Sequence, residues 1–156
     1  MLFSIILTLN IASAESHVMN VDNYIKKGYW ENTPSVVICK NQTIFSLEDV
    51  EYVMKKWGNI LSVQVKEKCN YEIETGKIKI IDDKMIDRKK YNGLTEYYFY
   101  TKKTDTGITY KEYTGAIVQL NKEITNIEIL LHEIGHAYGY AHYDHGHDVM
   151  NTYKYY

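Results

Sequence analysis

Two histidines and a glutamate near the end of the chain have the types and spacing of a metal-dependent hydrolytic site. Residues 132–142 read HEIGHAYGYAH, in which His132 and His136 stand four positions apart. On a helix, side chains with this spacing project from one face, one above the other, so two imidazoles can share one small cation. Glu133 lies about 100° further round the helix axis. We expect Glu133 to hold a water bound to the metal and to act as its general base, as in the HExxH motif.

A glycine and a third histidine extend this pattern. Gly139 follows His136 by three residues, and glycine tolerates the positive φ that ends a helix in a sharp turn. That turn can return His142 to the same ion. Three neutral imidazoles with an open fourth position are typical of catalytic zinc, whereas calcium and magnesium prefer oxygen ligands. The pattern therefore predicts one catalytic Zn²⁺ ion bound by His132, His136 and His142.

The same residues resemble a known family. The segment HEIGHAYGYAH, followed by DVM at 148–150, is similar to the metzincin pattern HExxHxxGxxH with a downstream methionine turn. The spacing from His142 to Met150 resembles that of the matrixins, and the similarity extends over 35–156. A bare HExxH also arises by chance in helices with surface histidines. In such a helix, however, the additional glycine, histidine and methionine have no reason to stand where they do.

The resemblance implies a fold and a set of roles. The fold is α/β (α+β): a metzincin-like twisted mixed sheet with two main helices, a C-terminal active-site helix and a short lower subdomain. Met150 would lie beneath the metal as a hydrophobic base without binding it. Residues 115–120 would form an edge strand that pairs with extended substrate. Residues after Met150 would wall the adjacent pocket, and Tyr153 or Tyr155 could donate a hydrogen bond to an oxyanion.

The upstream chain must supply the sheet that positions this site. Runs of β-branched or alternating residues, separated by turn signals, predict strands and a hairpin around Asp105-Thr106-Gly107. The charged stretch 83–95 contains Asn92-Gly93 and predicts a surface loop. The expected strands are 35–39, 62–65, 77–81 and 115–120, and the expected hairpin arms are 97–100 and 108–113.

Two amphipathic helices are also predicted. Ser46 is followed three residues later by an acid, apolar residues recur at helical spacing through 47–57, and Gly58 supplies the stop. Trp57 lies on the apolar stripe, which favours a place in the core over a role in binding. A second helical period begins at about Thr125 and carries the site.

Length and composition favour one ordinary globular domain. The chain has 156 residues, of which 45% are apolar, so it can bury a core and is not expected to be disordered. The formal net charge is -2, and the lysines come in pairs mixed with acids, such as Lys55-Lys56. A solvated surface explains these pairs, so nucleic-acid binding is not expected.

The N-terminus has the pattern of an export signal. Residues 1–14 read MLFSIILTLNIASA, a short apolar run that ends in small residues before Glu15. The run is too short for a transmembrane helix. Because no Lys or Arg precedes it, the apolar tail of a cytosolic protein is the alternative. The polar residues 15–34 predict an N-terminal arm ahead of a catalytic domain at 35–156, and a secreted or otherwise extracytoplasmic location is expected.

The chain contains two cysteines, Cys39 and Cys69. In an exported chain, an even pair predicts a disulfide. In a reducing cytosol, both would instead be buried thiols. No CxxC or Cys-His pair points to a second metal or to a thiol nucleophile.

These residues together predict a zinc-dependent endopeptidase that hydrolyses peptide bonds of peptides or proteins, with Glu133 activating the water. One alternative is a zinc-binding interaction module that has lost turnover, against which the intact Glu133 argues. Another is a structural protein with an accidental motif. His145 and His147 could bind a second metal, but a solvated polar loop explains them more simply.

Overall fold

The protein is described by a computed structural model that covers most of the expected domain. The expected signal at 1–14, His145, His147, Tyr153 and Tyr155 lie outside the described residues. The described residues are 19, 24–58, 62–83, 91–121, 123, 126–143 and 149–151.

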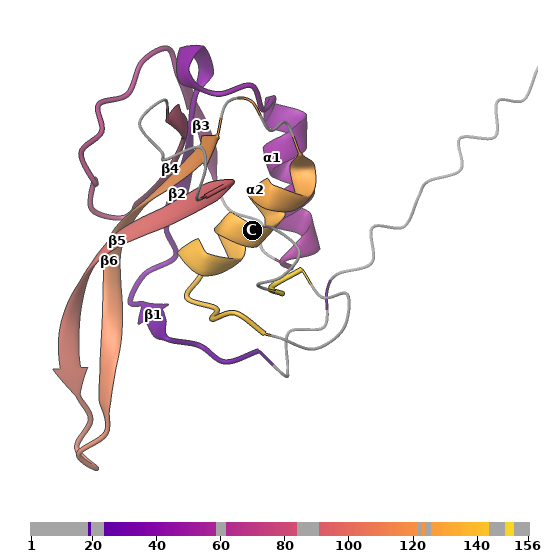
Figure 1. Ribbon diagram of the computed structural model, residues 1–156. Helices are drawn as coiled ribbons and strands as arrows, with labels where there is room; N and C mark the ends of the chain where they lie inside the picture. The colour runs from indigo at the N-terminus through magenta and orange to yellow at the C-terminus, as the bar shows by residue number, and fades with distance from the viewer. Residues whose placement is uncertain are drawn as a thin grey trace, which may run out of the picture.

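Six strands form one mixed sheet, in which five strands follow the order β1-β6-β4-β2-β3 and β5 pairs with β6. All pairs are parallel except the β5–β6 hairpin, which extends away from the helices in Figure 1. This arrangement confirms the mixed α/β class. The strands are β1 (Gly28–Trp30), β2 (Ser35–Cys39), β3 (Val63–Lys66), β4 (Lys77–Asp83), β5 (Gly93–Lys103) and β6 (Thr109–Asn121).

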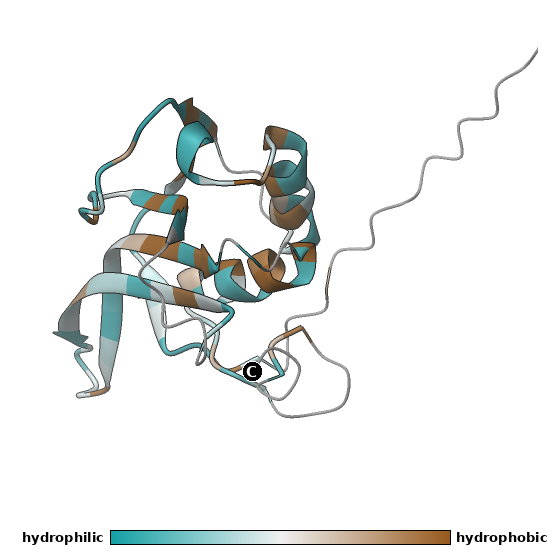
Figure 2. Cartoon of the chain, turned by 45° about the horizontal axis from the view of Figure 1, so that its top comes forward, coloured by the Kyte–Doolittle hydropathy of each residue, from teal (hydrophilic) through white to brown (hydrophobic). Residues whose placement is uncertain are grey.

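Two helices, α1 (Leu47–Lys56) and α2 (Ile127–Ala137), pack on one face of this sheet (Figure 1). A short 3-10 turn, η1 (Lys40–Gln42), follows β2. Both helices carry hydrophobic and hydrophilic bands in Figure 2, as expected when one side of a helix is buried. The main core lies between them and the sheet. Its fully buried members include Val36, Val50, Val53, Ile78, Ile80, Val118, Leu130 and Ile134.

The predicted start and stop of α1 are confirmed. The Ser46 side chain accepts a hydrogen bond from the Asp49 backbone, and the Asp49 side chain accepts one from the Ser46 backbone, which completes a capping box. Gly58 has a φ of 71° and follows Trp57, the C-cap of the helix. Trp57 is 5% exposed and belongs to the main core, as its place on the apolar stripe indicated. None of the described helices is long and apolar enough to span a membrane.

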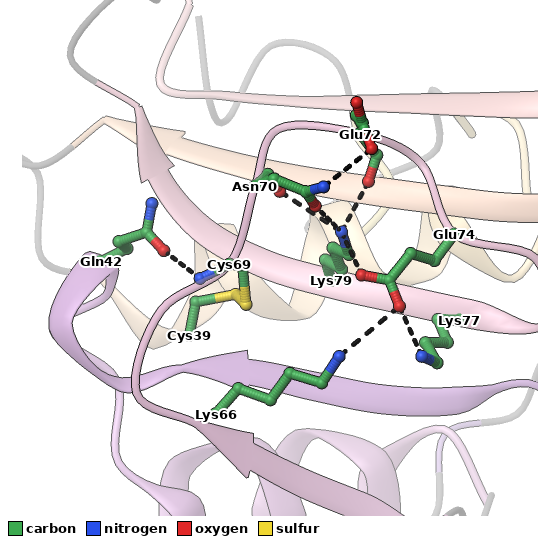
Figure 3. Close-up of a disulfide and its surroundings, with 9 residues drawn as sticks. All are labelled: Cys39, Gln42, Lys66, Cys69, Asn70, Glu72, Glu74, Lys77 and Lys79. Atoms are coloured by element: carbon green, nitrogen blue, oxygen red, sulfur yellow. Dashed lines mark hydrogen bonds and ion pairs between the residues drawn. A yellow bond between two sulfur atoms is a disulfide. The ribbon is translucent and has the colours of Figure 1, made fainter.

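The opposite face of the sheet is covered by the chain between β3 and β4. A disulfide joins Cys39 of β2 to Cys69 in this segment (Figure 3), so the predicted pairing is confirmed. Lys79 of β4 is fully buried, and its ammonium donates to Asn70 Oδ1 at 2.7 Å and to the Glu72 carbonyl at 2.6 Å. It also pairs with Glu74. A buried charge needs such partners, and these contacts bind the segment to the sheet.

The position of two strands differs from expectation. β5 begins at Gly93, inside the stretch 83–95 that was predicted as a loop, because residues from Gly93 onward pair with β6. Residues 115–120 are not an edge strand. They lie within β6, which pairs with β5 on one side and with β4 on the other, so their backbone groups already have strand partners. β5 has β6 as its one strand partner among the described residues.

Candidate metal centre

Three histidine side chains converge at the end of α2. His132 and His136 project from one face of the helix, as their spacing predicted, and His142 returns from the turn that follows. The Nε2 atom of His136 lies 3.1 Å from Nε2 of His132 and 3.0 Å from Nε2 of His142. The three residues can therefore hold one metal ion between them.

The tautomers of the two helical histidines suit a metal. Nδ1 of His132 lies 2.7 Å from the Val149 carbonyl, and Nδ1 of His136 lies 2.8 Å from the Tyr140 carbonyl. A carbonyl oxygen can only accept, so each Nδ1 carries the proton and each Nε2 presents a lone pair. Burial lowers the pKa of His132 to about 4 and that of His136 to about 3, so both rings are neutral at pH 7. Two lone pairs that face each other are best accommodated by a cation between them.

The turn after α2 brings the third histidine into place. Gly139 has a φ of 96°, which confirms the predicted left-handed turn. A Cβ atom on this glycine would lie 2.3 Å from the Gly28 carbonyl oxygen, so the residue is also needed for close approach of the N-terminal arm. The Lys27 backbone N–H donates to the Gly139 carbonyl at 2.7 Å, and the Ala141 N–H donates to the Ile25 carbonyl at 2.8 Å. Part of the expected arm thus supports the segment that carries His142.

Two tryptophans hold α2 through its carbonyls. The Trp57 indole N–H donates to the Leu131 carbonyl at 2.9 Å, and the Trp30 indole N–H donates to the Ala137 carbonyl at 2.8 Å. Ala137 is the last residue of α2, where backbone carbonyls lose their helical partners. Trp30 lies in β1, so the arm also completes the end of the site helix.

Met150 is fully buried and packs on α2 at Gly135, and its expected role as a hydrophobic base beneath the metal stays a prediction. A Cβ atom at Gly135 would lie 2.5 Å from the Met150 sulfur and 2.5 Å from an edge carbon of Trp57. Gly135 therefore lets the methionine and the indole approach the helix. The Tyr143 N–H donates to the Met150 carbonyl at 2.9 Å, so these two residues lie side by side. Sequence reasoning did not single out Gly135, although a glycine inside a helix costs about 1 kcal/mol and signals a packing reason.

Glu133 is 4% exposed and lies against the start of β5. The Thr95 hydroxyl lies 2.7 Å from Glu133 Oε2 and 3.0 Å from the Glu133 carbonyl oxygen. A Cβ atom at Gly93 would lie 2.6 Å from Glu133 Cγ, so only glycine leaves room for this side chain. Burial raises the pKa of Glu133 to about 7, and the hydrogen bond from Thr95 lowers it in part. Sequence reasoning did not identify Gly93 and Thr95, because both lie in the stretch that was predicted as a surface loop.

These groups open onto one pocket beside β5. Its lining combines the expected base with two of the three histidines and a cationic arm residue. The lining residues are Lys27, Gly93, Leu94, Thr95, Tyr97, Glu133, His136, Tyr140 and His142. A small molecule or chain that enters the pocket meets the carboxylate and the imidazoles together.

Comparison with known proteins adds no family to this geometry. No protein-family model matches the chain, and no curated protein sequence matches it. The geometry by itself establishes a mixed α/β fold whose C-terminal helix and following turn bring together three histidines that can hold a metal ion.

Proposed function

We propose that this protein is a zinc-dependent endopeptidase of the metzincin type. The observation that carries the proposal is that a buried carboxylate lines one pocket with two members of a three-histidine group, His136 and His142. A closed structural site would use a fourth protein ligand. Among the described residues, the group around His136 contains the three imidazoles and no further Cys, Asp or Glu ligand. The proposal therefore assigns an open fourth position to the ion, as a hydrolytic metal site requires.

Zinc suits the donor set better than the other common ions. Nitrogen ligands in a tetrahedral arrangement are typical of zinc, whereas calcium and magnesium take oxygen ligands. His132, His136 and His142 would hold the ion through Nε2. When bound, a zinc ion supplies Lewis acidity, which polarises a carbonyl and lowers the pKa of water.

Glu133 would perform the proton transfers. Its carboxylate would accept a proton from the attacking water and deliver it to the leaving amine. A pKa near 7 matches this double role, because a group that both takes and gives a proton works best when its pKa is close to the working pH.

The proposed substrate platform is the side of β5 that has no strand partner among the described residues. Leu94, Thr95 and Tyr97 of β5 line the pocket, and the strand pairs with β6 on its other side. An extended peptide could add to such an edge as a further strand, with its scissile bond at the pocket. This platform replaces residues 115–120, which the resemblance had suggested and which lie inside the sheet.

We further propose that the enzyme works outside the cytoplasm. The Cys39–Cys69 disulfide is typical of oxidising compartments. The apolar residues 1–14 fit the same interpretation. The substrate would accordingly be an extracellular or periplasmic peptide or protein.

The test is zinc content and cleavage of labelled casein by protein purified from an exporting host. Glu133→Gln keeps the size and the metal ligands, and Glu51→Gln on the exposed surface of α1 is the matched control. We expect one zinc per chain in all three proteins, and cleavage by the parent and the control alone. Zinc without cleavage of any peptide library would favour the inactive binding module. Absence of zinc in the parent would overturn the proposal.

A further inference from the structure

We propose that Thr95 is a positioning residue for the general base: it holds the Glu133 carboxylate in the pocket that His136 and His142 also line. This role rests on the proposed peptidase function. The evidence for it is independent of the histidine motif, because Thr95 comes from β5, 38 positions before Glu133 in the sequence.

The first residues of β5 form a seat for the Glu133 side chain. Gly93 and Thr95 are two positions apart on a strand, so they face the same side of the sheet, toward α2. Pairing with β6 fixes both of them, since Gly93 lies opposite Leu120 and Thr95 lies opposite Val118. The positions of Gly93 and Thr95 are therefore set by the β5–β6 pairing.

The hydroxyl of Thr95 constrains both ends of the Glu133 residue. It lies 2.7 Å from the carboxylate oxygen Oε2 and 3.0 Å from the backbone carbonyl of the same residue. One hydroxyl proton can serve one acceptor fully at a time, and both acceptors belong to Glu133. Rotation of the glutamate away from the pocket would break the shorter of these bonds. A hydrogen bond to a charged group is among the stronger ones in proteins.

Gly93 completes the seat from the other side. A Cβ atom there would lie 2.6 Å from Glu133 Cγ and 2.7 Å from Oε1. Any larger residue would push the carboxylate out of its position. With Oε2 bonded to Thr95 and Oε1 beside Gly93, the carboxylate has one packed orientation in the pocket.

The experiment compares Thr95→Val and Thr95→Ser with the parent, each loaded with zinc. Valine keeps the branched shape and removes the hydroxyl, whereas serine keeps the hydroxyl. Thr101→Val is the matched control, because Thr101 lies on the same strand at an exposed position outside the pocket lining. The measurements are zinc content, thermal unfolding, kcat and KM on a casein-derived fluorescent peptide, and binding of acetohydroxamate. This ligand chelates zinc and needs a neighbouring proton acceptor, so its affinity reports the position of Glu133 without turnover.

We expect Thr95→Val to lower kcat about tenfold and to weaken acetohydroxamate about tenfold, the loss of one charge-assisted hydrogen bond. Zinc content and KM should stay at the parent values, and Thr95→Ser and Thr101→Val should behave like the parent. Equal kcat and equal acetohydroxamate affinity in Thr95→Val and the parent would overturn the positioning role and leave the peptidase intact. A parent that binds acetohydroxamate and cleaves nothing would contradict the proposed peptidase function. The acetohydroxamate affinities of the parent and of Thr95→Val would still test the role of Thr95.

Discussion

The indole ring of Trp57 is stacked on the phenol ring of Tyr140, with ring centroids 5.1 Å apart and planes 13° apart. Trp57 is the C-cap of α1, and the carbonyl of Tyr140 accepts the hydrogen bond from the imidazole of His136. The core residue Trp57 therefore packs on the residue whose carbonyl orients the ring of His136, a candidate metal ligand. A residue that the helical pattern assigns to the core also supports the site.

Replacement of Trp57 by phenylalanine should weaken both the fold and metal binding. The variant loses the hydrogen bond to the Leu131 carbonyl and part of the stack on Tyr140. We expect the free energy of unfolding to fall by about 1–3 kcal/mol, and zinc affinity to fall with it. Urea unfolding of the metal-free protein and zinc titration measure the two effects. Tyr52→Phe, at an exposed position of α1, is the control and should change neither.

Replacement of Gly135 by alanine should destabilise the protein, although alanine is the better helix former by about 1 kcal/mol. The added methyl group would meet the sulfur of Met150 and the edge of Trp57. Overpacking of this kind costs about 1–3 kcal/mol. Chemical unfolding provides the measurement, and a more stable Gly135→Ala variant would contradict the close packing of Met150 on α2.

A double variant isolates the part due to the methionine. Met150→Ala by itself should be destabilising because it empties a fully buried site. In the Gly135→Ala background the same change should cost less, because it also removes one clash. Additive effects of the two substitutions would indicate that Trp57 alone opposes the methyl group.

Acid should destabilise the metal-free protein between pH 7 and pH 5. The pKa values of His132 and His136 are lowered by burial to about 4 and about 3, so the unfolded chain binds protons that the native protein does not. The contribution of the two neutral rings to the free energy of unfolding is complete above the unfolded pKa of about 6.5. It is lost as the pH falls, by about 2 kcal/mol for each histidine at pH 5. Protonation of the ligands should also release zinc over the same range.

Glu133 acts in the opposite direction over that interval. Its pKa is raised by burial to about 7, so the native protein binds a proton before the unfolded chain does and gains about 2 kcal/mol by pH 5. The net loss from the three groups should therefore be about 2 kcal/mol in the parent and about 4 kcal/mol in Glu133→Gln. Urea unfolding at pH 7, 6 and 5 gives both slopes. Parallel slopes in the two proteins would show that Glu133 is ionised throughout.

Reduction of the disulfide should lower stability without emptying the metal site. Cys39 and Cys69 are 30 positions apart, and closing a loop of that length stabilises a protein by about 3 kcal/mol. The bond lies on the sheet face opposite α2, away from the histidines. The double variant Cys39→Ser/Cys69→Ser should unfold at a lower urea concentration than the parent. It should still bind one zinc per chain. Loss of zinc from the folded variant would contradict this separation of the two faces.

Most local structure could be predicted from short segments. The capping box at Ser46, the strand at 35–39 and the turn at Gly139 all depend on residues close together in the chain. The convergence of the histidines was also predictable, because helical spacing and one positive φ determine it. The disulfide needed only the knowledge that two cysteines share one chain and the expectation of export.

The hairpin arm expected at 97–100 is confirmed as part of β5, but the start of this strand at Gly93 could not be predicted from its own residues. Asn92-Gly93 and the surrounding charges are typical of a loop, and the strand starts this early because residues from Gly93 onward pair with β6. The edge or central position of a strand depends equally on its neighbours. For this reason residues 115–120 were wrongly expected at the edge of the sheet.

By itself, then, the sequence determined which residues could bind a metal, their helical spacing and the turn that returns His142. Only the tertiary structure decided what surrounds them: Thr95 and Gly93 around Glu133, and the arm against Gly139. The physical reason is distance along the chain. Periodicity and capping act within a few residues, whereas these contacts join segments tens of positions apart and form only when the whole core packs.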